Sequence, residues 1–251
     1  MDVSTTTAAR WVERWERQQQ LYAVDREERF EVIADLVEHV TRDCPAPLVL
    51  DLGSGPGCLA ARLAGRLPTA EVLAVDADPL LLELGSAHYG SALRYVRTLI
   101  GAPGWLDTLD LARPADAVVS TTALHYLGTD TLRRVYRELA GLLRPGGILI
   151  NGDHISPDST KVSELAVDIG RRRAARSAAS LTEDWESWWS SAATDPELAP
   201  LLSRRDDGGR PHCEGNDLTL SGHVALLRDA GFEHVGAVWQ VGPSHVLAAV
   251  R

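Results

Sequence analysis

Residues 48–78 read LVLDLGSGPGCLAARLAGRLPTAEVLAVDAD, and this stretch decides the fold. It begins with an apolar run short enough for a buried strand, passes through a glycine-rich loop, and continues into an Ala- and Leu-rich run typical of a helix. Pro68 ends that helix, and a second apolar run, from Val72 to Val75, leads to Asp76. Strand, loop, helix and strand in this order predict a βαβ unit with a right-handed crossover.

The loop and the acids beside it predict a bound cofactor. The glycines of the Gly53–Gly57 run carry no Cβ, so the backbone can approach a ligand closely. Asp76 ends the second strand, where a carboxylate accepts hydrogen bonds from ribose hydroxyls. A dinucleotide fingerprint is G-x-G-x-x-G, but here Cys58 stands where the third glycine belongs. Asp51 would repel a pyrophosphate and instead suits a ligand that carries an amino group and a sulfonium.

Several stretches resemble one enzyme family. DLGSGPG at residues 51–57 resembles motif I of the class I S-adenosylmethionine (SAM)-dependent methyltransferases, and AVDAD at residues 74–78 resembles their motif II. The run at residues 115–127 resembles motif IV and its continuation. LRPGGILI at residues 143–150 resembles the family's signature before strand five, and LLRDAGF at residues 226–232 resembles the C-terminal part of family members. The resemblance covers about residues 45–155 and 219–251, and it is to the members that act on small molecules.

The resemblance implies an α/β fold with a Rossmann-like seven-stranded mixed sheet, helices on both faces and an antiparallel C-terminal hairpin. We expect an N-terminal helical cover at 1–44, a SAM-binding core at 45–155, a helical lid insertion at 156–218 and completion of the core at 219–251. The cover is predicted to hold helices at about 8–22 and 26–41, the first capped by Thr5 to Thr7. At 251 residues, a single domain is expected.

Composition and charge narrow the function further. The net charge of −10 argues against a nucleic-acid partner, because such affinity depends largely on Lys and Arg. No apolar run approaches the length of a membrane span, and the N-terminus lacks the apolar core of a signal peptide, so we expect a cytoplasmic protein without a membrane partner. The three cysteines form no C-x-x-C pair, and His212 beside Cys213 is better explained by chance than by a metal site. A homodimer is compatible with the sequence.

The resemblance also implies which residues bind SAM. Arg26 is a candidate to pair with the carboxylate of SAM, although a solvated Arg26 and a packed Tyr22 explain the sequence equally well. Leu99 stands where the family often has an acid for the adenine amino group, so backbone, Thr98 or water would hold that group instead. Trp105 either stacks on the adenine or packs in the core. The full set of expected cofactor-binding residues is Tyr22, Arg26, Asp51, Gly53, Ser54, Gly55, Asp76, Ala77, Thr98, Leu99 and Ser120.

Two histidines are the candidate catalytic residues, and no metal ligand is expected. His125 and His154 follow neighbouring strands of the predicted sheet, and the carboxyl ends of such strands bind ligands. An imidazole titrates near neutral pH, so either can act as a general base for an acceptor that carries a proton. The alternatives are that His125 packs at the start of a helix and that His154 lies in a surface loop.

The expected lid carries two unusual runs. The arginines from Arg171 to Arg176 either hold an anionic substrate or form a solvated helix face. Trp185, Trp188 and Trp189 have helical spacing, and they either wall an apolar substrate or attach the lid to the core.

The sequence therefore predicts a SAM-dependent methyltransferase acting on an O, N or C atom of a small molecule, with SAM as cofactor. One alternative is an enzyme that uses SAM for other chemistry, such as a cyclase or a lyase. Another is a non-catalytic SAM-binding module, against which the intact loop and the acid at the ribose position both count.

Overall fold

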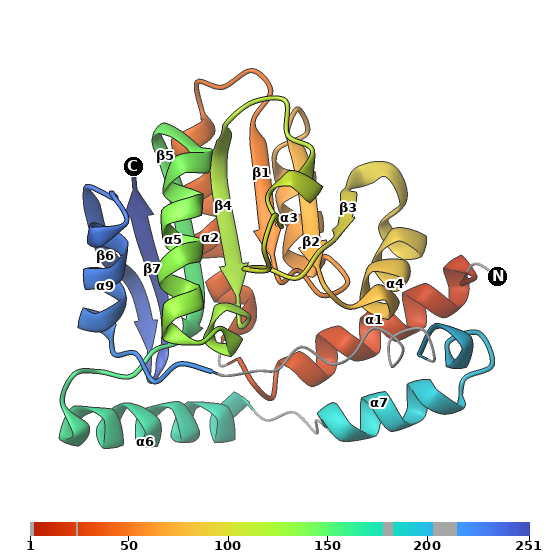
Figure 1. Ribbon diagram of the computed structural model, residues 1–251. Helices are drawn as coiled ribbons and strands as arrows, with labels where there is room; N and C mark the ends of the chain where they lie inside the picture. The colour runs from red at the N-terminus through yellow and green to blue at the C-terminus, as the bar shows by residue number, and fades with distance from the viewer. Residues whose placement is uncertain (1–2, 24, 178–182, 203–214) are drawn as a thin grey trace.

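The computed structural model describes residues 3–23, 25–177, 183–202 and 215–251. These residues form one mixed sheet of seven strands in the order β3-β2-β1-β4-β5-β7-β6 (Figure 1). Strands β1 to β5 are parallel, whereas β7 runs antiparallel to both β5 and β6. The strands are β1 (Leu48–Leu52), β2 (Glu71–Asp76), β3 (Arg94–Arg97), β4 (Ala115–Thr121), β5 (Leu143–His154), β6 (His234–Val241) and β7 (Ser244–Val250). The predicted sheet and its C-terminal hairpin are confirmed.

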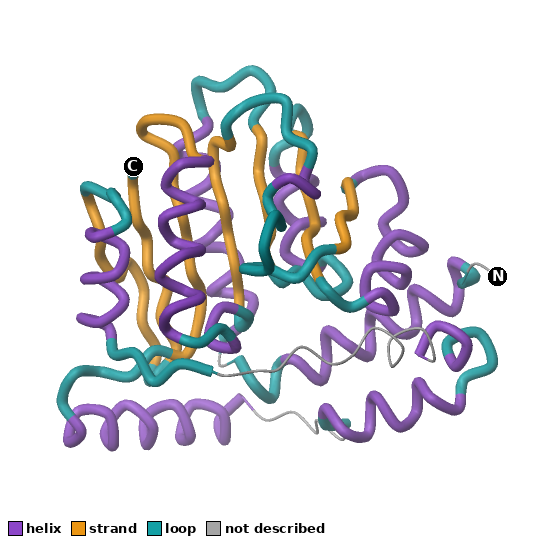
Figure 2. The backbone as a smooth tube through the Cα atoms, viewed as in Figure 1, coloured by secondary structure: helices purple, strands orange, loops and turns teal. Residues whose placement is uncertain are grey.

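Helices cover both faces of the sheet (Figure 2). Their bounds are α1 (Thr5–Gln19), α2 (Arg26–Thr41), α3 (Cys58–Arg66), α4 (Pro79–Tyr89), α5 (Thr129–Leu142), α6 (Thr160–Ser177), α7 (Trp185–Thr194) and α9 (Leu220–Asp229). Alternate strand residues face opposite ways, so the sheet has two apolar cores. One core packs Val49 against Ile33 of α2 and Leu59 of α3, and the other packs Val118 against Val135 of α5.

Helix α1 starts earlier than the sequence predicts. The cap is Ser4 rather than Thr5 to Thr7, because the Ser4 hydroxyl accepts a hydrogen bond from the Thr7 amide at 3.3 Å. Strand β5 also starts earlier than expected: LRPGGILI at residues 143–150 resembles the approach to strand five, but Leu143 already belongs to the strand and pairs with Ala115 of β4. Both differences lie at element ends, where local capping and pairing decide the boundary.

The described part of residues 156–218, the expected lid, contains the helices α6 and α7. Helices α6 and α7 lie beyond the carboxyl ends of the parallel strands, α7 beside α1 and α6 near the β6–β7 hairpin (Figure 1). The turn-like run at 206–209, His212 and Cys213 lie outside the described residues. None of the helices in the described part of the chain is long and apolar enough to cross a membrane.

The arginine run of α6 lies on an exposed helix face. Arg171 and Arg172 both pair with Asp168 one turn earlier, and Arg173 pairs with Asp25 at the start of α2. The carboxylates of Asp168 and Asp25 thus balance the charges of Arg171, Arg172 and Arg173. The structure agrees with the solvated helix face and not with an anion site.

The tryptophans of α7 attach it to α1. Trp188 is fully buried, and its ring centroid lies 5.2 Å from those of Trp11 and Trp15. Trp105 is likewise a core residue, buried with its indole nitrogen donating to Glu138 at 2.6 Å. The core alternative is therefore the correct one for Trp105 and for Trp188.

Candidate functional site

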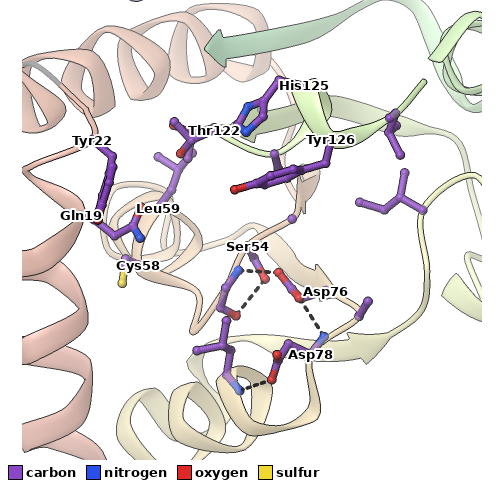
Figure 3. Close-up of a pocket in the computed structure, with 18 of the residues that line it drawn as sticks. Gln19, Tyr22, Ser54, Cys58, Leu59, Asp76, Asp78, Thr122, His125 and Tyr126 are labelled. Atoms are coloured by element: carbon purple, nitrogen blue, oxygen red, sulfur yellow. Dashed lines mark hydrogen bonds between the residues drawn. The ribbon is translucent and has the colours of Figure 1, made fainter. Parts of the chain in front are cut away.

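A cavity of about 1560 Å³ opens at the carboxyl ends of the parallel strands (Figure 3). Its wall comes from the loops after β1, β2, β3 and β4, from the end of β5, and from α1, α2 and the start of α7. A pocket for one small ligand usually measures about 300–1,000 Å³. The volume therefore suits a cofactor together with a second molecule.

The glycine loop closes tightly against its neighbours. Gly53 has a φ of 71°, and a Cβ there would lie 2.3 Å from the Cβ of Ala123. Gly55 has a φ of 55°, and its Cβ would lie 3.3 Å from the ring of Trp15 on α1. Both positions thus need glycine for conformation and for space. The loop forms a cradle of bare backbone at the cavity wall, as the sequence predicts.

A further glycine, Gly85 of α4, packs against this loop, and sequence reasoning missed it. Gly85 lies in the middle of α4, where a Cβ would stand 2.0 Å from the carbonyl oxygen of Pro56. The helix can therefore approach the loop only because residue 85 has no side chain. A glycine inside a helix costs about 0.5–1 kcal/mol of stability relative to Ala. A glycine in a predicted helix is therefore the sequence feature that could have indicated this close packing.

Asp76 holds the loop and faces the cavity. Its Oδ2 accepts a hydrogen bond from the Gly55 amide at 2.8 Å, and its Oδ1 accepts one from the Asp78 amide at 2.9 Å (Figure 3). Each carboxylate oxygen has a second lone pair, so both can still accept from a ligand. Burial raises the pKa of Asp76, while the two amides oppose that rise. Asp78 caps α4 by accepting from the amides of Leu80 and Leu81.

Asp51 and Ser120 are not on the cavity wall. Asp51 is fully buried, with Oδ2 accepting from the Ala60 amide at 3.1 Å and no protein partner for Oδ1. Ser120 is also fully buried, and its hydroxyl donates to the Leu52 carbonyl at 2.8 Å across the β1–β4 pair. Asp51 acts on the cavity only through its charge, and Ser120 joins two strands.

The Asp51 carboxyl makes stability depend on pH. Burial raises its pKa from 3.8 to about 7, with the nearby charge of Asp76 contributing. The folded chain therefore binds this proton more tightly than the unfolded chain does. Stability falls as the pH rises from the ordinary pKa of 3.8 to the raised pKa of about 7. We expect Asp51→Asn to flatten the fall in unfolding temperature between about pH 4 and about pH 8. The exposed control Asp107→Asn should keep the wild-type slope, and an unchanged slope in Asp51→Asn would contradict this assignment.

Arg26 and Tyr22 both line the cavity, at the side of α1 and α2. Arg26 is nearly buried, pairs with Glu16 and Glu27, and lies over the ring of Phe30 at 4.3 Å. Its charge is thus already balanced within the protein. The Tyr22 hydroxyl accepts from the Trp185 amide at 3.0 Å, which joins the end of α1 to the start of α7.

The end of β3 contributes Arg97, Thr98 and Leu99 to the wall. Leu99 occupies the position where the family often has an acid, and Asp107 does not line the cavity. Thr98 is fixed because its amide donates to the Asp76 carbonyl at 2.9 Å. Of the expected cofactor-binding residues, this wall brings together Tyr22, Arg26, Gly53, Ser54, Gly55, Asp76, Ala77, Thr98 and Leu99.

His125 lies on the same wall, in a short turn after β4, and is held by Asp153 of β5. Its Nδ1 lies 2.8 Å from Asp153 Oδ1, and its backbone amide donates to Asp153 Oδ2 at 3.3 Å. Asp153 is 2% exposed, and its Oδ1 also accepts from the His154 amide at 2.8 Å. Asp153 already accepts from two backbone amides, so Nδ1 is the donor in this contact, and a neutral imidazole then has Nε2 as its acceptor. Asp153 is a positioning residue for His125.

His154 lines the cavity from the end of β5. Its ring is open to the cavity, but the surrounding protein still desolvates it, and this desolvation lowers its pKa. The buried guanidinium of Arg29 lowers that pKa further, while Asp153 opposes the change. Among the described residues, none offers a carboxylate bonded to the side chain of His154, so His125 is the better-oriented of the two candidate bases.

Several residues of the wall were missed by the sequence reasoning. These are Trp15, Gln19, Phe30, Cys58 and Tyr126, whereas Trp185 and Trp189, which also line the cavity, had been considered as a substrate wall. Trp15 and Phe30 come from the apolar faces of α1 and α2, where a cavity wall and a core have the same pattern. Within the described residues, no three His, Cys, Asp or Glu side chains group as they would around a metal ion.

Comparisons with known proteins agree with this geometry. A family model described as a methyltransferase domain matches residues 49–147. Trans-aconitate 2-methyltransferase of Methylobacterium radiotolerans is 31% identical over 186 residues, which are 73% of this chain and 61% of that protein. The chain thus spans about three fifths of the length of this curated relative.

Solved structures share the fold. Magnesium protoporphyrin IX methyltransferase from Synechocystis PCC 6803, with bound SAH, superposes with a TM-score of 0.51 at 17% identity, covering 94% of each chain. Human N-acetylserotonin methyltransferase in complex with SAM gives a TM-score of 0.53 at 17% identity, covering 95% of this chain and 56% of that chain. At such identities the likeness shows the fold alone.

Proposed function

We propose, because the chain belongs to the class I SAM-dependent methyltransferases, that it transfers the methyl group of SAM to a proton-bearing atom of a small molecule. The observation that carries the proposal is the fixed pair of His125 and Asp153 beside the glycine cradle. A module that only bound SAM would need the cradle but would have no use for an oriented base. The trans-aconitate relative carries a tricarboxylate in its name, but this chain spans only 61% of it.

The residues present fit SAM. The bare backbone of Gly53 and Gly55 leaves room that a Cβ would fill, and Asp76 keeps two lone pairs for the ribose hydroxyls. Burial raises the pKa of the Asp51 carboxyl, and a cationic ligand nearby would oppose that rise by stabilising the carboxylate. When bound, SAM supplies an electrophilic methyl group on a sulfonium.

The protein supplies orientation and removal of a proton. His125 presents Nε2 as an acceptor because Asp153 holds Nδ1. A base within hydrogen-bond reach of the acceptor atom removes its proton as the new bond forms. Asp153 then stabilises the imidazolium that results, since its carboxylate lies 2.8 Å from Nδ1.

Mass spectrometry of the products tests this proposal. The purified chain, incubated with SAM and a panel of hydroxylated and amine-bearing small molecules, should release S-adenosylhomocysteine together with a methylated acceptor. Release of 5′-methylthioadenosine would instead identify the cyclase or lyase alternative. If calorimetry shows SAM binding but neither product forms, the non-catalytic SAM-binding module is the remaining alternative. A cytoplasmic location and a homodimer stay predictions. Size-exclusion chromatography of the purified chain tests the homodimer.

We also propose that α1 and α7 close together over the ligands. They form a joint cover, since Arg14 pairs with Glu183, and Asp195 accepts from Trp11 at 2.9 Å and from Arg10 at 2.7 Å. We expect SAM and acceptor to protect α1, α6 and α7 from hydrogen exchange, because closure sequesters the reaction from water. The core helix α5 is the internal control. Equal protection of the cover with and without ligands would identify it as a fixed addition.

A further inference from the structure

The cavity has two ends with different chemistry. The cofactor end is the glycine loop, Asp76 and the end of β3. The rest of the wall, which we call the acceptor wall, includes Tyr22, His125, Tyr126, His154, Trp185 and Trp189. Trp185 and Trp189 contact Trp15, which packs on Gly55, so they lie between the glycine loop and the other residues of this wall. Four of these six acceptor-wall side chains are large aromatic rings that come from three separate parts of the chain.

Three of these four rings are exposed. Tyr22 is 42%, Tyr126 50% and Trp185 38% exposed. The Tyr126 ring projects into the cavity, with its centroid 4.1 Å from that of His125 at an interplanar angle of 49° (Figure 3). Trp185 and Trp189 adjoin each other, with centroids 5.5 Å apart. Exposed apolar surface gathered in a hollow is typical of a ligand-binding wall, and flat rings are the partners that aromatic side chains favour.

The charges around the cavity do not suit an anionic acceptor. Two arginines, Arg26 and Arg97, line it among the described residues, and a third, Arg29, is buried behind His154 with the charge of Asp153 facing it. Arg26 pairs with Glu16 and Glu27, and Arg97 lies at the cofactor end with Nε directed to the Ala77 carbonyl at 3.4 Å.

Two carboxylates stand beside the aromatic rings instead. Asp184 and Glu186 line the cavity at the start of α7. A hydrogen bond with Ser187 lowers the pKa of Asp184, so this side chain is ionised at neutral pH. An acceptor that carried several carboxylates would meet like charges here, and the guanidinium of Arg29 is buried with Asp153 and does not line the cavity.

We infer that the acceptor is a flat aromatic compound without a carboxylate, stacked on Tyr126 so that its proton-bearing atom reaches His125. Tyr126 is then a specificity-determining residue, and the acceptor differs in class from the tricarboxylate in the name of the Methylobacterium radiotolerans relative. The inference rests on the proposed function, because it assigns the acceptor of that same cavity.

A matched pair of probes tests the inference. Methyl 3-(4-hydroxyphenyl)propionate and its free acid share ring, hydroxyl and chain length, and they differ in one negative charge. Their affinities are measured by quenching of tryptophan fluorescence with S-adenosylhomocysteine present, and trans-aconitate is the third probe. We expect the ester to bind about tenfold more tightly than the acid, and trans-aconitate to bind more weakly than both.

Two variants separate the ring from the hydroxyl of Tyr126. Tyr126→Leu should weaken ester binding roughly tenfold, whereas Tyr126→Phe keeps the ring and should stay within about twofold of wild type. Because Tyr126 is half exposed, both variants should fold, which thermal unfolding verifies.

The outcomes are distinguishable from a failure of the proposed function. Tighter binding of the acid or of trans-aconitate, wild-type ester affinity in Tyr126→Leu, or no quenching by the ester up to roughly 1 mM would each overturn the aromatic acceptor. Calorimetry of SAM binding runs in parallel. SAM binding without ester binding removes only this inference, whereas loss of SAM binding removes the proposed function itself.

Discussion

Replacing His125 with alanine is expected to lower turnover by roughly 10²–10⁴ while leaving SAM affinity nearly unchanged. The physical reason is that, in the proposed mechanism, Nε2 of His125 accepts the proton of the acceptor, while the glycine loop and Asp76 would hold the cofactor. Steady-state kinetics with the acceptor found by product analysis, together with calorimetry of SAM binding, measures both quantities.

Two further histidine variants act as controls for this result. His234 lies at the start of β6 on the exposed edge of the sheet, so His234→Ala should turn over at the wild-type rate. His154→Ala examines the rival base from the next strand. If His154→Ala loses turnover and His125→Ala does not, the assignment of the base to His125 is wrong. An acceptor that is already ionised in solution would make the loss in His125→Ala smaller, because no proton has to be removed.

Replacing Asp76 with alanine is expected to cost about 2–3 kcal/mol of SAM binding, since hydrogen bonds to a charged carboxylate are among the stronger ones. That loss corresponds to roughly 30–150-fold in the dissociation constant. The variant also loses the bond from Asp76 to the Gly55 amide, so the loop is less well ordered before binding. Isothermal titration calorimetry with SAM gives the number.

Asp107→Asn is the matched control for the Asp76 variant. Asp107 is the first acid after β3, it is exposed, and it does not line the cavity. Its replacement should leave SAM affinity unchanged, which also tests the prediction that no carboxylate after β3 holds the adenine amino group. Wild-type affinity in Asp76→Ala would remove this residue from the cofactor site.

The cofactor end of the cavity could be predicted from the sequence because its determinants are local. Gly53, Gly55 and Asp76 fall within one βαβ unit, where strand, loop and strand follow each other without a gap. Ser120 shows the limit of that reasoning. Its place at the end of β4 suggested the cavity, but the side chains of a strand alternate, and pairing with β1 directs Ser120 to Leu52.

The acceptor end could be predicted only in part. His125 followed from its place after a strand, but its contact with Asp153 depends on the register in which β4 and β5 pair. The contact of Trp15 with Trp185 joins residues far apart in the chain. Each tryptophan belongs to a helical pattern of tryptophans, and that pattern is the same whether the ring packs in the core or binds a ligand. Three-dimensional proximity alone tells these roles apart.

A crystal structure of the chain with S-adenosylhomocysteine tests the central claim most directly. The account predicts that the ribose hydroxyls bind both oxygens of Asp76, that the sulfur faces the acceptor wall, and that His125 lies on the sulfur side with Nδ1 on Asp153. A ribose bound away from Asp76, or a sulfur directed away from His125, would contradict it.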